Sequence, residues 1–243
     1  MSDPEISVVL PARNEERLLP AALDSIAAQS LEPARLEAIV VSNGSRDRTV
    51  MVAAERARAL AARGGPRVEL LDHVPPGVAR AKNVGARAAR GAALVFMDAD
   101  SRMSPGLLAA VVRRREQGER AASIRVVADG RDPIDRGFFW VIENGKRLVG
   151  IRANMFWVDR ELFDALGGFD ERLNHAEDLD LLVRARRAGV KVGHLRAEWI
   201  ATSPRRLHRG PLRIGMLLML GRWVLGHLGI GRSWPYSGGG AEP

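Results

Sequence analysis

The stretch Ala92-Ala93-Leu94-Val95-Phe96-Met97-Asp98-Ala99-Asp100 decides the fold. Its first six residues are apolar, as in a buried strand, and the chain leaves them directly into two carboxylates. Side chains at positions i and i+2 of an extended chain face the same way, so Asp98 and Asp100 are expected to point at one ion. Hard oxygen ligands at that spacing suit Mg²⁺ or Mn²⁺. An isolated Asp-x-Asp is more commonly a solvated turn, so its meaning depends on its surroundings.

The residues before this strand alternate between β-branched runs and longer Ala, Leu and Arg-rich stretches of helical spacing. This pattern predicts an α/β fold, a layered sandwich with a central, mostly parallel sheet flanked by helices. The expected strands are residues 6–10, 37–42, 67–72 and 92–98, and the expected helices are residues 18–29, 47–62 and 78–89. Asp98 therefore ends the fourth predicted strand.

Polar turns follow three of these strands. They are Pro11-Ala12-Arg13-Asn14-Glu15, Ser42-Asn43-Gly44-Ser45 and Asp98-Ala99-Asp100. In an open α/β sheet, ligands bind outside the carboxyl ends of the strands. Three polar turns at one edge of one sheet predict a binding site, whereas one such turn would be an ordinary loop.

The second half of the chain has a different pattern. Residues 129–170 are rich in Phe and Trp. We interpret this half as the side of the site that would hold a second substrate, an acceptor. A helix is predicted at 177–188, followed by a strand at 190–195.

An apolar stretch at residues 211–231 is interrupted by Arg213, Arg222 and His227, so its longest uncharged run is far shorter than the roughly 20 residues that span a bilayer. Basic residues and Trp223 beside a Leu and Met-rich surface fit a helix lying on a membrane. A helix packed on its own domain is an equal alternative.

Composition limits the classes of protein. A chain of 243 residues with 46% hydrophobic content can bury one ordinary core. Cysteine is absent and the start of the chain is polar and acidic, so we expect a cytoplasmic protein without an export signal, associated with the inner face of the membrane if residues 211–231 are interfacial. The net charge is +8, but the arginines that dominate it are scattered over the whole chain. We therefore expect no nucleic-acid partner, and favour a phosphate-rich partner or a membrane surface.

Five segments in order resemble the family-two glycosyltransferases of GT-A fold. They are residues 7–16, 40–49, 79–85, 96–100, and 168–171 with 177–180. The resemblance implies a GT-A type, Rossmann-like sandwich at residues 1–200, with a nucleotide-sugar-binding half at 1–128 and an acceptor half at 129–200. Residues 201–243 would form a C-terminal extension.

The activity implied is inverting transfer of a hexosyl group from a nucleotide-sugar to an acceptor hydroxyl, with Mn²⁺ or Mg²⁺ on the diphosphate. The implied donor-binding residues are Pro11, Ala12, Arg13, Glu15, Asn43, Gly44, Lys82, Asn83, Gly85, Asp98, Ala99 and Asp100. Asp98 and Asp100 would also hold the metal, and Asp178 would be the general base. Glu177 and Trp157 would lie on the acceptor side, and the acceptor would be a glycan or lipid-linked.

Several positions leave alternatives open. The family commonly has two acidic residues where this chain has Ser42-Asn43, and an amide both donates and accepts, so UDP-sugar and GDP-sugar donors both stay open. His175 and His208 are candidates for a third metal ligand. Asp178 and Asp180 also suit the start of a helix for electrostatic reasons. The basic loop at 203–206 is either a phosphate clamp or an ordinary loop.

Other α/β classes fit less well. The turn after the first strand lacks the glycines of a dinucleotide-binding oxidoreductase, and no Gly-Lys-Ser/Thr loop of an NTPase occurs. A sugar nucleotidyltransferase would normally open with a Gly-rich basic loop. A non-catalytic nucleotide-sugar-binding protein of the same fold is the remaining alternative, and it has no need of Asp98, Asp100 and Asp178 together.

Overall fold

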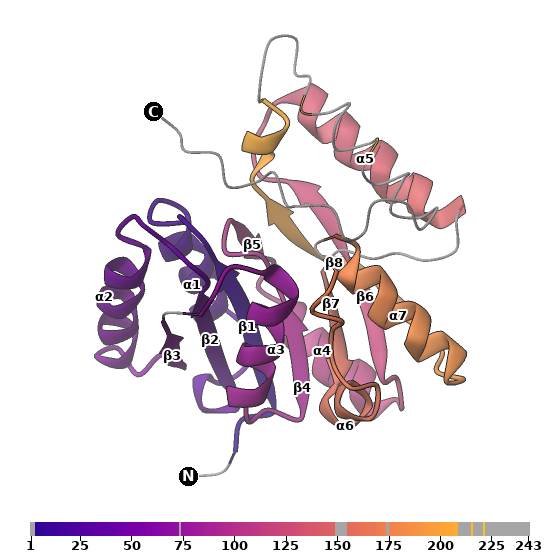
Figure 1. Ribbon diagram of the computed structural model, residues 1–243, viewed down its shortest axis with the longest axis horizontal. Helices are drawn as coiled ribbons and strands as arrows, with labels where there is room; N and C mark the ends of the chain where they lie inside the picture. The colour runs from indigo at the N-terminus through magenta and orange to yellow at the C-terminus, as the bar shows by residue number, and fades with distance from the viewer. Residues whose placement is uncertain are drawn as a thin grey trace.

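A single sheet of eight strands organises the protein in the computed structural model, which describes residues 3–72, 74–148, 155–173 and 175–208, together with Gly215 and Gly221. The strand order is β3-β2-β1-β4-β7-β6-β8-β5. Figure 1 shows the sheet running through the molecule with helices on both sides. The predicted α/β class is therefore confirmed.

The first four strands are parallel to one another. They are β1 (Ile6–Ala12), β2 (Leu36–Ser42), β3 (Arg67–Leu71) and β4 (Ala93–Phe96). The helices between them are α1 (Leu19–Ala27), α2 (Thr49–Ala61) and α3 (Val78–Ala88), and a short 3₁₀ turn, η1 (Pro33–Arg35), precedes β2. Each predicted strand and helix of this half begins and ends within two residues of its expected bounds, and β4 ends two residues before Asp98.

The second half continues the same sheet with mixed directions. Its strands are β5 (Ser101–Met103), β6 (Ala121–Ala128), β7 (Phe156–Asp159) and β8 (Gly193–Thr202). β7 is antiparallel to both β4 and β6, while β8 is parallel to β6 and antiparallel to β5. The strand predicted at 190–195 starts later and runs to Thr202, so the expected domain boundary at 200 falls inside β8.

Helices cover both faces of the sheet. One apolar layer joins α1, α2 and α4 (Leu107–Glu116) to the sheet, and the other joins α3, α6 (Arg160–Ala165) and α7 (Glu177–Arg187). Neighbouring strand residues such as Val9 and Leu10 are therefore both buried, on opposite faces. Strands covered on both faces read as continuous apolar runs, which explains the sequence of β1, β2 and β4.

Aromatic residues of the second half mostly fill the core. Trp157 lies in β7 between Val95 of β4 and Ala122 of β6, and its side chain is fully buried. Trp157 was predicted on the acceptor side, and in this structure its side chain is part of the apolar layer between the sheet and α1, α2 and α4. On the other face, Phe96 and Phe169 meet edge-on with ring centroids 4.9 Å apart.

α5 (Pro133–Leu148) packs against β6, and the 3₁₀ turn η2 (Pro204–Arg206) follows β8. The helix predicted at 211–231 lies outside the described residues, apart from Gly215 and Gly221. Within the described part of the chain, no helix has both the length and the apolar character needed to cross a membrane.

Gly85 brings α3 close to the sheet. A Cβ at this position would lie 2.5 Å from Val9 Cγ1 and 3.0 Å from Val41 Cγ2. The side of α3 that carries Gly85 therefore faces β1 and β2. Gly85 was predicted to bind the donor, and in this structure the residue allows α3 to pack closely on the sheet.

Replacing Gly85 by Ala is expected to lower the free energy of unfolding by about 1–3 kcal/mol, because the added methyl group overpacks the contact with Val9. Urea denaturation followed by circular dichroism measures the change. Gly137→Ala is the matched control, since Gly137 is helical with open space around its Cβ position, and it should stabilise by up to about 1 kcal/mol. Unchanged stability of Gly85→Ala would contradict the close approach of α3.

Candidate active site

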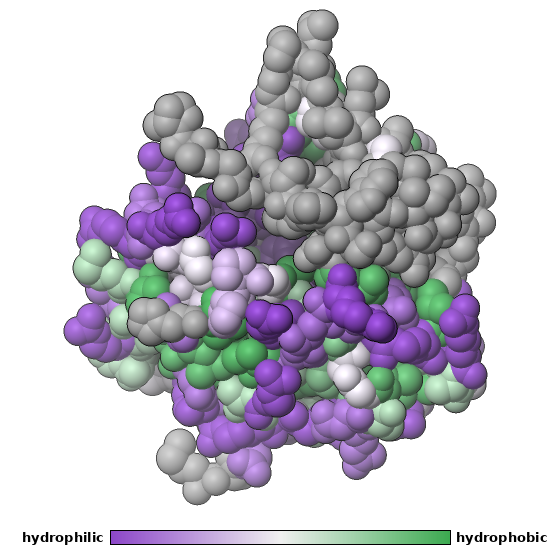
Figure 2. All heavy atoms as spheres, viewed as in Figure 1, coloured by the Kyte–Doolittle hydropathy of each residue, from purple (hydrophilic) through white to green (hydrophobic). Residues whose placement is uncertain are grey.

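Two of the predicted polar turns form one surface at the carboxyl edge of the sheet. β1 and β2 end side by side, with Ala12 paired to Ser42. The backbone N–H of Asn43 donates to the Ala12 carbonyl at 3.0 Å, and that of Glu15 donates to Thr49 Oγ1 at 2.8 Å. The space-filling view shows a recess above these strand ends, and the atoms visible at its back are hydrophilic (Figure 2).

Three predicted donor-binding residues have buried polar atoms without a partner in the described part of the chain. These atoms are Arg13 Nε, Glu15 Oε2 and Asn43 Oδ1. An unpaired buried polar group costs free energy, so each is suited to a ligand that completes its hydrogen bonding. Gly44 next to them has φ +85°, and a Cβ there would lie 3.0 Å from Pro76 Cγ. The turn after β2 is thus compact enough to approach a ligand.

Asp98 and Asp100 lie just beyond β4, in a turn rather than in an extended strand. The turn is tied to the end of β8, because the Asp100 carbonyl accepts from Ser203 N–H at 3.1 Å and its carboxylate accepts from Thr202 Oγ1 at 3.4 Å. Burial raises the pKa of Asp98, and the charge of Asp100 raises it further. The two carboxylates therefore repel each other, and a cation between them is favoured.

Arg205 of η2 supplies a positive charge at this position. Its guanidinium donates to the carboxylate of Glu15 and, at 3.3 Å, to Asp100 Oδ2. Burial raises the pKa of Glu15 to about 7, with Asp100 adding to the shift and Arg205 opposing it. The basic loop at 203–206 thus binds the site's own carboxylates in this structure.

Lys82 of α3 joins the site to the start of α7. Its ammonium donates to Asp178 Oδ1 at 2.6 Å and to Glu177 Oε1 at 2.8 Å, and the side chain is almost completely buried. Burial alone would lower the pKa of Lys82, but the charges of Asp178 and Glu177 outweigh it and raise the pKa above its usual value. Burial raises the pKa of Asp178 to about 8, against the opposing effect of Lys82. Glu177 and Asp178 share the single charge of Lys82, and the raised pKa of Asp178 favours a proton on its carboxyl group.

Asn83 has a different position from the one expected. Its amide nitrogen donates to the Phe169 carbonyl at 2.9 Å, and its amide oxygen accepts from Phe169 N–H at 2.9 Å. The same amide also donates to Glu171 Oε1. These bonds fix the Gly168-Phe169 turn, and Phe169 lies 5.3 Å below the Lys82 ammonium. In this structure the Asn83 side chain therefore fixes the turn that carries Phe169, the residue beneath Lys82.

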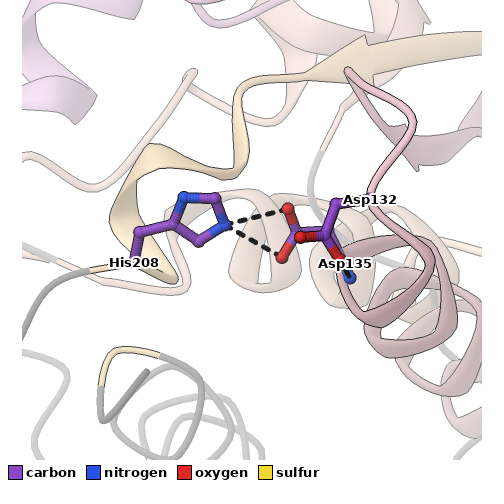
Figure 3. Close-up of side chains that lie close together, drawn as sticks. All are labelled: Asp132, Asp135 and His208. Carbon is purple, nitrogen blue, oxygen red and sulfur yellow. Dashed lines mark hydrogen bonds and ion pairs between the residues drawn. The ribbon is translucent and has the colours of Figure 1, made fainter. Parts of the chain in front are cut away.

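A second group of metal-ligating side chains lies near the start of α5, where Asp132, Asp135 and His208 converge (Figure 3). His208 Nε2 lies 2.9 Å from Asp135 Oδ2, and the ligand atoms of all three residues lie within 4.8 Å of one another. His208, which was predicted as a ligand at the site of Asp98 and Asp100, contacts Asp135 in this structure. Sequence reasoning missed Asp132 and Asp135 because 73 residues separate Asp135 from its partner His208.

A hollow of about 350 Å³ at the opposite edge of the sheet contains none of the predicted site residues. It is lined by Arg115, Glu119, Arg120 and Asp159, among others. Asp159 pairs with Ala93, at the start of β4, whereas Asp98 follows the end of that strand. The chemistry-bearing residues are at the other edge.

Comparison with known proteins identifies the family. Residues 7–168 match the model of glycosyl transferase family 2. The chain belongs to this family. An uncharacterized glycosyltransferase of Mycobacterium tuberculosis (strain ATCC 25618 / H37Rv) is 30% identical over 237 residues, which cover 92% of this chain and 98% of that protein. A dolichyl-phosphate beta-glucosyltransferase of Drosophila melanogaster is 38% identical over 103 residues, 40% of this chain and 31% of that protein.

Solved structures share the fold of this glycosyltransferase. S. aureus TarS 1–349 in complex with UDP has a TM-score of 0.66 at 19% identity, covering 95% of this chain and 73% of that one. The mannosyltransferase PcManGT from Pyrobaculum calidifontis, in complex with GDP-Man and Mn²⁺, has a TM-score of 0.68 at 23% identity, covering 95% and 66%. The predicted GT-A type fold is confirmed.

Replacing Arg205 by Gln is expected to destabilise the glycosyltransferase more at alkaline than at acidic pH. Without the guanidinium, the pKa of Glu15 rises further, and a buried acid whose pKa is raised costs stability only where it is ionised. The expected loss is about 1 kcal/mol near pH 8.5 and less near pH 5, a modest value because the guanidinium is 40% exposed. Urea unfolding at the two pH values measures it.

Arg102→Gln is the control, since Arg102 pairs with Asp129 at the surface, and it should cost little at either pH. An equal loss for Arg205→Gln at both pH values would show that the Glu15 charge is not what Arg205 neutralises.

Proposed function

We propose that this glycosyltransferase transfers a hexosyl group from a nucleoside-diphosphate sugar to an acceptor hydroxyl with inversion. The observation that carries the proposal is the convergence at one sheet edge of the Asp98 and Asp100 carboxylates with the unpaired buried atoms of Arg13, Glu15 and Asn43. A nucleotide with a diphosphate offers both the hydrogen-bonding groups and the cation-bound anion that this edge would accept.

The divalent cation would be Mn²⁺ or Mg²⁺, held by Asp100 and Asp98. Both side chains are hard oxygen ligands, and their mutual repulsion favours a cation, so they fit the ion. When bound, the ion neutralises the diphosphate and helps it leave. Arg205 would then release Asp100, because the diphosphate offers its guanidinium another anion. A structural neighbour in complex with GDP-Man and Mn²⁺ supports this assignment.

Asp178 would act as the general base. The acceptor oxygen attacks the anomeric carbon while the bond to the diphosphate breaks on the opposite face, and the acceptor's proton passes to the Asp178 carboxylate. The bond from Lys82 at 2.6 Å holds this carboxylate at the start of α7, and Glu177 beside it would lie toward the acceptor. A pKa of about 8 suits a group that takes up a proton during turnover.

The nucleobase and the acceptor are the open parts of this proposal. Asn43 would contact the base, and its amide is compatible with uridine and guanosine. Neighbours of the same fold carry UDP, UDP-GlcNAc or GDP-Man. The similarity of part of the chain to a dolichyl-phosphate beta-glucosyltransferase supports a lipid-linked acceptor.

The proposed activity predicts release of UDP or GDP from at least one member of a nucleotide-sugar panel with Mn²⁺, and its loss with EDTA. Asp100→Asn should weaken the metal-dependent part of nucleotide binding, measured by isothermal titration calorimetry with and without Mn²⁺. Asp180→Asn is the matched control, since Asp180 pairs with Arg184 on the same helix as Asp178 and away from the cation. If no donor bound or reacted, the proposal would fail.

Turnover of the wild-type enzyme should rise with pH and reach half its maximum near pH 8, because only deprotonated Asp178 accepts a proton. Asp178→Asn should reduce turnover by about 10²-fold or more, the effect of losing a general base, with nucleotide affinity close to that of wild type. Initial rates from pH 6 to 9 and a nucleotide titration provide the test. Wild-type turnover in Asp178→Asn would refute the assignment of the base.

A further inference from the structure

The outward side of α5 exposes three large apolar side chains beside polar ones. Ile134 and Val141 are each 55% exposed and Trp140 is 67% exposed, and they are three of the four large hydrophobic side chains that the described residues expose. Ile134 and Val141 are seven residues apart, so they lie on one stripe of the helix, and Trp140 flanks this stripe, turned about 100° from Val141 around the helix axis. The fourth, Met51, lies on α2 by itself.

The opposite face of α5 is apolar. Phe139 and Ile142 are buried, and the helix packs there on β6. A surface helix of a globular protein ordinarily has a polar outward face. Three large apolar side chains exposed on α5 depart from that pattern, although Arg136 and Asn144 are exposed on the same helix.

The charges around this face are basic. Arg131 and Arg136 are exposed, and none of the exposed side chains between 131 and 145 is acidic. Of the acids in this segment, Asp135 is buried, Glu143 lies 3.1 Å from His194 Nε2, and Asp132 accepts from the backbone N–H groups of Ile134 and Asp135 at the start of the helix. Trp with aliphatic residues, flanked by arginine, is the composition that lies at the boundary between lipid headgroups and acyl chains of an anionic membrane.

The apolar face is close in the fold to the candidate active site. Asp135, in the first turn of α5, contacts His208, and His208 follows by three residues the Arg205 that binds Asp100. Figure 1 shows α5 beside β8 and η2, apart from the layers formed by α1 to α4. A surface that covered α5 would therefore lie near the carboxyl edge of the sheet.

We propose that the outward face of α5, formed by Ile134, Trp140 and Val141 with Arg131 and Arg136, docks on the surface of an anionic lipid membrane. Docking through α5 brings the edge that carries Asp98 and Asp100 to the membrane, where a lipid-linked acceptor is presented. That consequence for the acceptor rests on the proposed function, whereas the docking itself does not.

The test is co-sedimentation of the full chain with vesicles of phosphatidylcholine containing phosphatidylglycerol. The double variant Trp140→Ser/Val141→Ser should partition about ten-fold less than wild type or weaker, because two inserting side chains are lost. Met51→Ser is the matched control and should bind like wild type, since Met51 is an exposed apolar residue on another helix. All variants retain residues 209–243, so a difference between them belongs to α5.

The double variant Arg131→Gln/Arg136→Gln should lose binding to the anionic vesicles, with little change on vesicles of phosphatidylcholine alone. Thermal unfolding should stay unchanged in every variant, because the replaced side chains are exposed. Equal vesicle binding by wild type and Trp140→Ser/Val141→Ser, or no binding by wild type, would overturn the proposal. So would a wild-type dimer that this double variant converts to a monomer, because a second copy would then cover the face.

Nucleotide binding is measured on the same samples. Wild type that binds vesicles but no nucleotide would reject the proposed function and leave the docking surface standing. Wild type that binds nucleotide but no vesicles would reject the docking surface and leave the proposed function standing.

Discussion

Buried negative charge at the carboxyl edge of the sheet is the constraint on which the rest of the site depends. These carboxylates come from three separate segments, Glu15, Asp98 with Asp100, and Asp178, and burial raises the pKa of Glu15, Asp98 and Asp178. Such charges cost free energy unless cations accompany them, and here Lys82 bonds to Asp178 while Arg205 bonds to Glu15 and Asp100. Lys82 is fixed in the fold by α3 and by Phe169 beneath it, whereas Arg205 is partly exposed on a short turn. Lys82 would therefore be a permanent cation beside the proposed base Asp178. Arg205 would be a replaceable cation at the proposed diphosphate position. Carboxylates kept at such a cost are typical of sites that use them.

Much of the first half was predictable from the sequence, for physical reasons. Each βα unit of a parallel sheet is local, so β1, β2, β3 and α1 to α3 leave a periodic pattern that can be read in order. The polar turns after these strands then fall at one edge without further information. In the second half, β7 has only four residues and pairs with strands far away in sequence, and β5 has three, so neither leaves a usable pattern. Trp157 is an example, because the sequence alone does not distinguish an aromatic residue that lines a ligand site from one that fills the core.

The contacts of the site depended on folding more than its position did. Asp98, Asp100, Lys82 and Asp178 were expected together, and the structure brings them to one edge. The roles of Asn83 and Gly85 in fixing a turn and packing a helix, and the pairing of His208 with Asp135, come from neighbours distant in sequence. Burial, which raises the pKa of Glu15, Asp98 and Asp178, is likewise a property of the fold and not of spacing.

Two groups of side chains compete for the role of cation site, Asp98 with Asp100 and Asp132 with Asp135 and His208. The most direct measurement is the anomalous scattering of Mn²⁺ in crystals grown with Mn²⁺ and a nucleoside diphosphate. The account predicts one peak in contact with Asp100 and the diphosphate, at a distance of about 2.0–2.6 Å from the oxygen ligands, with the Arg205 guanidinium withdrawn from Asp100. A peak only between Asp135 and His208, with Arg205 still bonded to Asp100 and Glu15, would contradict it.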